Sequence, residues 1–312
     1  MWKVDYDRFR NDVNRDELIS YINKICDEFL ESDELNSICD ILGTTPDSID
    51  SDYNARQRSD GTYVEQQLMK KNEDLEQYRS KLFPLFNALG FYQRYDTELK
   101  GYNHIVVLGG TYNAGYFRTS CAKEFVNSNV KTVDGLTCYR PISPIEKKVK
   151  EYKSNGDTEF GALSDAFVEV FNLGDSEYED KFTSNRNINS VTNIRTFEVR
   201  YQGATLRLYA CPSLEPDIRR ANTGDCIRYY VENNTFKEED KVIFVSNSRY
   251  CNRQFLQILY YLLKTPVVFP FDIVAYTNQD CRATVDKIDL SYDVQELIAI
   301  IDWVNRFKEE YN

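Results

Sequence analysis

Short apolar runs alternate regularly with amphipathic segments after residue 101 of this chain. Residues 105–108 (IVVL) and 242–245 (VIFV) are continuous apolar runs, typical of strands that a parallel sheet buries on both faces. A helical pattern follows each run, and residues 273–276 predict one more strand. This alternation predicts a doubly wound, mostly parallel α/β sheet with right-handed crossovers.

The same patterns predict the other elements of this region. Residues 195–201 and 205–210 alternate apolar and polar side chains around Gln202 and Gly203, which indicates a hairpin. We also expect a strand at 130–138. Three helices are expected with one bound each: one that ends near residue 127, one that begins near Pro144 and one that begins after Asn222. Three more are expected over 161–171, 249–263 and 293–310, and Asp293 is the expected N-cap of the last.

The first hundred residues have a different character. An apolar stripe with helical spacing predicts a helix over 16–30, and two further helices are expected over 33–42 and 64–88, with a kink near Pro84. The stretch carries 13 Lys and Arg against 21 Asp and Glu. We therefore expect an acidic helical region at 1–100, able to dock a protein partner, and a Rossmann-like α/β domain at 101–312.

The net charge argues against one class of partner. The 312 residues include 50 Asp and Glu but only 38 Lys and Arg, a net charge of −12. Such a surface repels phosphate backbones at long range, so extended nucleic acid is not an expected partner. A local basic site for one small anion remains compatible with this charge.

Cysteine and histidine usage narrows the compartment and the chemistry. The eight cysteines form no CxxC pair, the first residues contain no apolar signal core, and no stretch reaches the length of a membrane span. We expect a cytoplasmic protein with reduced thiols and no membrane partner. The single histidine, His104, precedes a predicted strand, away from the carboxyl end where open α/β sheets place their sites. We interpret it as structural.

Four segments at predicted strand ends or helix starts carry the candidate site. Their ligand-binding candidates are Gly109, Gly110, Asn113 and Arg118 after the first strand, Arg140 after the second, Asn222 and Thr223 at a helix start, and Ser246, Asn247, Arg249 and Tyr250 after the 242–245 run. Glycines let a backbone approach a ligand closely, and a following helix offers free N–H groups to an anion. The Gly109 loop is neither GxGxxG nor a Walker loop, so no particular cofactor is indicated.

Two acidic residues, Asp225 and Glu146, are the candidate general bases. Each also has a purely structural interpretation, because carboxylates are favoured in the first turn of a helix. Helix capping equally accounts for Asn222 and Thr223. A metal at Asp225 or Glu146 would require a cluster of carboxylates, which a sequence does not place in space, so we name no metal ligand.

Three segments taken together resemble a known family. The order VVLGG at 106–110, NTGD at 222–225 and VIFVSNSR at 242–249 is similar to that of the YdcF/SanA/ElyC-type proteins. The resemblance covers roughly residues 102–263. It implies a Rossmann-like fold with a ligand pocket at the strand ends and a nucleotide-like ligand. The family pattern has an asparagine after the acidic residue, where this chain has Cys226.

Two functional hypotheses follow. The first is a protein that binds a nucleotide, a nucleotide-sugar or another phosphorylated metabolite, as a transferase or hydrolase if it is an enzyme. The second is a non-catalytic sensor or interaction protein whose N-terminal helices dock a partner. The sequence does not decide between them, and it identifies no cofactor.

Overall fold

The computed structural model describes residues 15–56, 69–97, 99–110, 112–144, 146–148, 154–237, 239–265, 268–277 and 289–312. The chain forms two compact units. The sheet unit comprises Tyr95–Asn247 and Gln257–Tyr276, and the helical unit comprises Met1–Arg94, Ser248–Leu256 and Thr277–Asn312.

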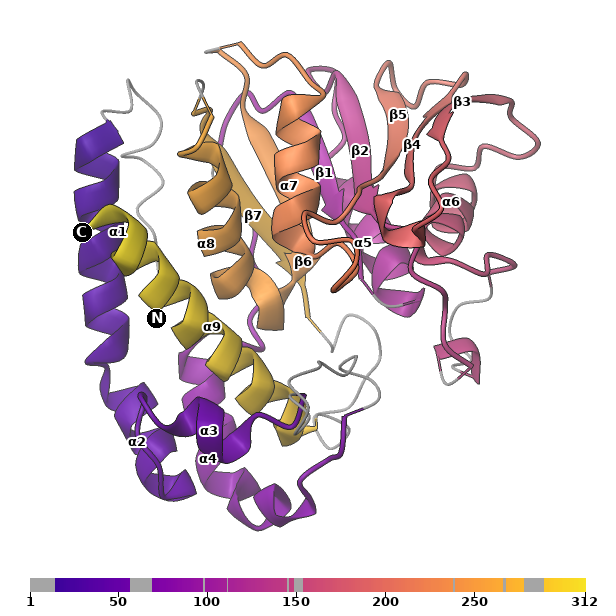
Figure 1. The fold of residues 1–312 in the computed structure, drawn as a ribbon. Coiled ribbons are helices and arrows are strands. Elements are labelled where there is room, and N and C mark those ends of the chain that lie inside the picture. The colour runs from indigo at the N-terminus through magenta and orange to yellow at the C-terminus, as the bar shows by residue number, and fades with distance from the viewer. Residues whose placement is uncertain are drawn as a thin grey trace. The chain divides into compact units, whose positions relative to one another are not determined.

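One sheet of seven strands organises the sheet unit, in the order β3-β4-β5-β2-β1-β6-β7 (Figure 1). The strands are β1 (His104–Leu108), β2 (Thr132–Thr137), β3 (Tyr178–Thr183), β4 (Thr192–Phe197), β5 (Thr205–Ala210), β6 (Val242–Asn247) and β7 (Phe271–Tyr276). The five strands from β5 to β7 are parallel, whereas β3 and β4 are antiparallel to their neighbours. The predicted doubly wound, mostly parallel α/β sheet is thus confirmed.

Helices cover both faces of the sheet, as its fully buried central strands require. They are α5 (Tyr112–Glu124), α6 (Glu159–Val170), α7 (Thr223–Glu232) and the last turns of α8 (Cys251–Leu262). Figure 1 shows α5 and α6 behind the sheet and α7 in front of it. Short 3₁₀ turns lie at Glu146–Lys148 and Ile188–Ser190.

The hairpin predicted around Gln202 and Gly203 is present between β4 and β5, and both residues have the positive φ angles that such a turn demands. β3 was not predicted from the sequence. All six of its residues are exposed, so it lacks the buried alternation by which a strand is recognised. The helix predicted from Pro144 is only a 3₁₀ turn as far as Lys148, and residues 149–153 lie outside the described part.

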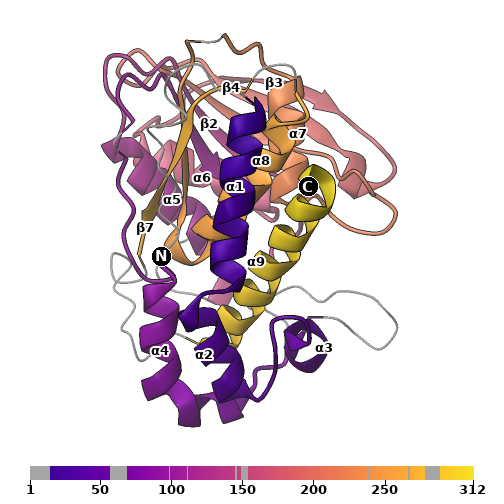
Figure 2. The same ribbon diagram turned by 90° about the vertical axis from the view of Figure 1, so that its left-hand side faces the viewer.

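The helical unit contains α1 (Arg15–Leu30), α2 (Asp33–Leu42), α3 (Ile49–Tyr53), a 3₁₀ helix (Glu73–Tyr78), α4 (Arg79–Ala88), a 3₁₀ turn (Ser248–Tyr250), the start of α8 and α9 (Leu290–Tyr311). Figures 1 and 2 show α1 beside α9, where Asn23 donates a hydrogen bond to the carbonyl of Tyr311. The helices predicted at 16–30 and 33–42 are confirmed. Within the predicted 64–88 helix, residues 64–68 lie outside the described part, and a 3₁₀ helix precedes α4.

The C-terminal helix differs from its prediction in two respects. Its N-cap is Asp289, whose carboxylate accepts from the N–H of Ser291, whereas the predicted cap, Asp293, is a fully buried residue of the first turn. In addition, α9 belongs to the helical unit, although the sequence placed it in a domain spanning 101–312. Its apolar side chains are buried against helices from the first hundred residues, which are distant in the sequence. No helix in the described ranges is both long enough and apolar enough to cross a bilayer.

Candidate functional site at the carboxyl edge of the sheet

The parallel strands bring several predicted segments to one edge. β1 ends at Leu108, β2 at Thr137, β5 at Ala210 and β6 at Asn247. The strand order reverses at β1: β2 lies on one side of it, and β6, the strand that follows β5 in the chain, lies on the other side. Ligands of open α/β sheets bind outside the carboxyl ends near such a reversal. His104 lies at the opposite, amino end of β1.

Arg118 stabilises the loop that leaves β1. Its buried guanidinium extends back from α5 and donates through Nη1 to the carbonyl of Leu108, at 2.7 Å, and to that of Gly109. A methyl group on Gly110 would lie 3.1 Å from the same nitrogen, so the loop and the arginine are closely packed. Asn113 lies in the first turn of α5. The contacts of Arg118 hold the Gly109 backbone in place.

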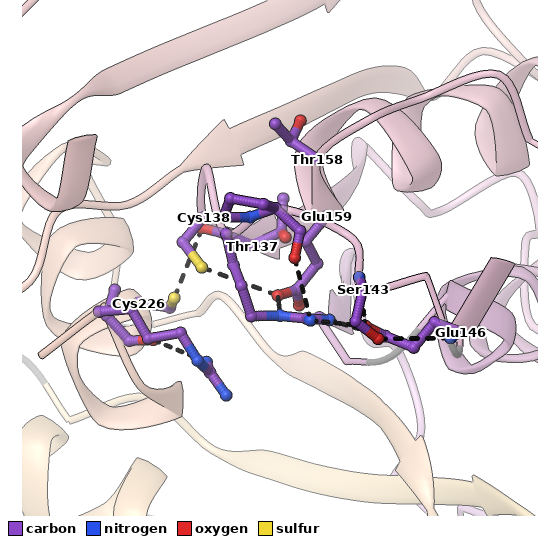
Figure 3. Close-up of polar contacts among 12 residues, drawn as sticks. Thr137, Cys138, Ser143, Glu146, Thr158, Glu159 and Cys226 are labelled. Carbon is purple, nitrogen blue, oxygen red and sulfur yellow. Dashed lines mark hydrogen bonds and ion pairs between the residues drawn. The ribbon is translucent and has the colours of Figure 1, made fainter. Parts of the chain in front are cut away.

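Arg140 lies between two glutamates. It forms a two-pronged ion pair with Glu146, at 2.8 and 2.9 Å, and its Nε lies 3.1 Å from Oε2 of Glu159 (Figure 3). All three side chains are buried. The positive charge of Arg140, which we predicted to bind an anionic ligand, is thus neutralised by two carboxylates of the protein.

The surroundings of Glu146 keep it ionised. Burial alone would raise the pKa of its carboxyl group, but hydrogen bonds from Arg140 and from the N–H of Ser143 outweigh this effect and lower the pKa to about 2. A carboxylate with so low a pKa is a weak base at neutral pH. The geometry therefore supports a structural role for Glu146.

We expect Glu146→Gln to make the protein less stable at pH 7 by about 1 to 3 kcal/mol. The folded-state pKa of Glu146 is below its unfolded value, so its contribution is complete above the ordinary pKa of 4.5 and is lost as the pH falls toward about 2. Urea unfolding at several pH values should show the difference from wild type narrowing over this interval. The control is Glu232→Gln, which changes a surface pair of α7; a difference independent of pH would contradict the prediction.

The start of α7 is capped internally. Asn222 and Asp225 form a capping box, in which each side chain accepts a hydrogen bond from the backbone N–H of the other. The fully buried Asp225 also forms an ion pair with Arg219. Thr223 is the first residue of the helix. Asn222 and Asp225 thus have the helix-capping role that their positions in the sequence suggested.

Two buried thiols lie beside this cluster (Figure 3). Cys138 lies 3.7 Å from Oε2 of Glu159, and Cys226 lies 3.6 Å from the carbonyl of Thr137. Burial, and then the charge of Glu159, raise the pKa of Cys138, although the charge of the half-buried Arg220 acts in the opposite direction. A hydrogen bond with the thiol of Cys211, together with complete burial, raises the pKa of Cys226. Both sulfurs are protonated at neutral pH and are poor nucleophiles.

The remaining predicted residues fall in both units. Ser246 and Asn247 end β6 in the sheet unit and are buried. Arg249 and Tyr250 belong to the helical unit, where Arg249 forms an ion pair with Asp293 at 2.6 Å. Within the sheet unit, the structure brings together Arg140, Glu146 and the start of α7 near the ends of β2 and β5.

Four residues of this edge were not among the sequence candidates: Thr137, Cys138, Glu159 and Cys226. Glu159 had the clearest signal. It follows Thr158, whose hydroxyl accepts from the N–H of Gly161 and caps α6. A threonine followed directly by a glutamate is a helix start, and the sequence interpretation began this helix at Gly161 instead.

Across the described ranges, no group of three or more His, Cys, Asp or Glu side chains is arranged to hold a metal ion. Comparisons with family models, curated proteins and solved structures found no match to this chain. The resemblance to the YdcF/SanA/ElyC-type family stays a prediction.

Proposed function

We propose that the carboxyl edge around β1 and β2 binds a small phosphorylated ligand that also carries hydroxyl groups, such as a nucleotide, a nucleotide-sugar or a sugar phosphate. The proposal depends mainly on one observation. The carboxylate of Glu159 lies directly beside the Gly109 backbone, since a methyl group built on Gly109 would be 2.8 Å from Oε1. The two features suit different parts of one ligand.

The phosphate is assigned to the start of α5. This helix has 13 residues and follows Gly109 and Gly110 almost directly, so its first N–H groups and its dipole favour a negative charge. Arg118 preorganises this backbone through the carbonyls of Leu108 and Gly109. In this proposal Arg118 supports the ligand loop, and the contact with the phosphate comes from backbone groups.

The hydroxyl groups are assigned to Glu159. Its Oε2 accepts from Arg140 and Cys138, whereas Oε1 is the oxygen beside Gly109. A carboxylate group accepts strong hydrogen bonds from sugar hydroxyls. The half-buried Arg220, which is close enough to influence the pKa values of Cys138 and Arg140, adds a positive charge near the same strand ends.

The contacts favour binding over turnover. Glu146 is held ionised by Arg140, Asp225 caps α7 and pairs with Arg219, and the nearby thiols are protonated. A sensor or carrier role therefore fits these residues better than a transferase or hydrolase role. A protein partner of the acidic N-terminal helices is compatible with this role and stays a prediction.

The test is a set of binding titrations with a nucleoside monophosphate, a nucleotide-sugar, a hexose phosphate and inorganic phosphate. We expect Glu159→Gln to weaken the hydroxylated ligands by about tenfold or more, the value of one charge-assisted hydrogen bond, and to leave inorganic phosphate unchanged or tighter. Arg220→Gln should weaken every ligand in the set.

The matched control is Arg228→Gln, because Arg228 lies on α7 in an exposed pair with Glu232. It should bind as wild type does. Melting curves without ligand establish that each variant is folded. If the wild type binds none of the four ligands, or if Glu159→Gln weakens inorganic phosphate as much as the hydroxylated ligands, the proposal is wrong.

A further inference from the structure

The exposed large apolar side chains that the structure describes lie within one stretch of the sequence. In the ranges that the structure describes, every exposed large apolar side chain lies between residues 178 and 218. These side chains are Tyr178, Phe182, Ile188, Val199, Leu214 and Ile218. Neighbouring exposed apolar side chains mark an interaction surface more often than single ones do, and two of these six, Tyr178 and Phe182, belong to one strand.

The edge strand β3 lies within this segment. It is the last strand of the sheet beside β4, and all six of its residues are exposed (Figure 1). No other described strand pairs with its outer edge. An open edge of this length presents unpaired N–H and C=O groups and is a template for a further strand.

The hydrogen-bond pattern identifies which residues face outward. The N–H of Glu198 donates to the carbonyl of Glu177, which makes these residues a hydrogen-bonded pair of the β3–β4 ladder. Such pairs alternate along an antiparallel ladder. The backbone groups of Tyr178, Asp180 and Phe182 therefore point away from β4, toward the free edge.

We propose that the β3 edge pairs antiparallel with β3 of a second copy of this chain, about a two-fold axis at Asp180, and so forms a continuous sheet across a homodimer. In this register the backbone of Tyr178 forms hydrogen bonds with the backbone of Phe182 in the second copy, and Phe182 does the same with the second Tyr178. Asp180 lies opposite Asp180 of the second copy. The outward-facing residues thus pair only with outward-facing residues, as a ladder requires.

The side chains match in the same register. Glu179 lies opposite Lys181 of the second copy, and Lys181 lies opposite the second Glu179, which gives two cross-strand ion pairs on one face. The other face gives two pairs of Tyr178 with Phe182. Moving the axis to Lys181 would place the two lysines opposite each other, so the charges select the register centred on Asp180.

The two aspartates at the axis are already neutralised. Asp180 accepts two hydrogen bonds from Arg195, at 2.8 and 2.7 Å. The guanidinium of Arg195 also lies over the ring of Tyr178, 3.6 Å from its centre. Two Asp–Arg pairs therefore meet at the axis in place of two bare carboxylates. A lysine on an edge strand usually prevents pairing, but here Glu179 supplies its partner.

The experiment is sedimentation equilibrium of the full chain over a range of concentrations. We expect a wild-type dimer, and roughly tenfold or more weaker association for Lys181→Glu and for Glu179→Lys, since each places two pairs of like charges across the axis. The double variant Glu179→Lys with Lys181→Glu should dimerise again. A mixture of the two single variants should form a heterodimer, because their charges are then complementary.

The control is Lys24→Glu, another reversal of an exposed lysine, and it should leave the dimer unchanged. All the substituted side chains are exposed, so folding should be preserved. Hydrogen exchange of the Tyr178, Asp180 and Phe182 amides should slow as the protein concentration rises. A wild type that stays monomeric at its solubility limit, or a dimer that Lys181→Glu leaves intact, would overturn the proposal.

Discussion

Asp134→Ala should lower the free energy of unfolding of the sheet unit by about 3 to 5 kcal/mol, because it leaves the buried hydroxyl of Tyr230 and the partly buried guanidinium of Arg207 without their acceptor. Asp134 lies in β2 and is fully buried. Its carboxylate accepts from Nε and Nη2 of Arg207 in β5, at 2.6 and 2.9 Å, from the hydroxyl of Tyr230 in α7, at 2.8 Å, and from Thr132, at 2.7 Å. One carboxylate thus joins two strands and a helix.

Urea unfolding followed by circular dichroism measures this effect. The double variant Asp134→Leu with Arg207→Met should recover much of the loss, since replacing both members of a buried ion pair by apolar groups removes the unpaired charge. The prediction is wrong if Asp134→Ala costs less than about 1 kcal/mol, the typical cost of a single substitution at any position.

The second large effect is expected in the helical unit. Asp293 of α9 is fully buried, forms an ion pair with Arg249 at 2.6 Å, and accepts from the hydroxyl of Tyr92 at 2.5 Å. Its two partners come from separate segments of the chain. Asp293→Ala leaves a buried arginine without its carboxylate, so we expect a loss of about 3 to 5 kcal/mol.

Limited proteolysis of the native protein and urea unfolding both report on this pair. Cleavage should become faster within the helical unit, where the three segments lose their common contact. The comparison variant is Asp293→Leu with Arg249→Met, which should be more stable than Asp293→Ala. Equal stability of Asp293→Ala and wild type would mean that the pair does not hold the unit together.

The elements that could be predicted from the sequence are those with at least one buried face. The runs at 105–108 and 242–245 are strands of the sheet, and the stripe at 16–30 is a helix, because burial on one or both faces is written into consecutive residues. β3 has no buried face. It depends on its backbone pairing with β4, which no local pattern records.

The candidate site was predicted in part. The sequence placed Gly109, Arg140 and Asn222 at strand ends and helix starts, and the structure has them there. It did not predict that Glu146 and Glu159 would take up the charge of Arg140. An arginine after a strand has the same local pattern whether its partner is a ligand or a glutamate.

The doubly wound sheet and the acidic character of the first hundred residues could be predicted from the amino-acid sequence alone. Each of these depends on residues close together in the chain or on composition alone. The partners of Arg118, Arg140 and Arg249, and the packing of α9 with the N-terminal helices, became evident only in the folded protein. These outcomes depend on which groups share a buried space, where an unpaired charge is costly, and that space exists only after distant segments have packed together.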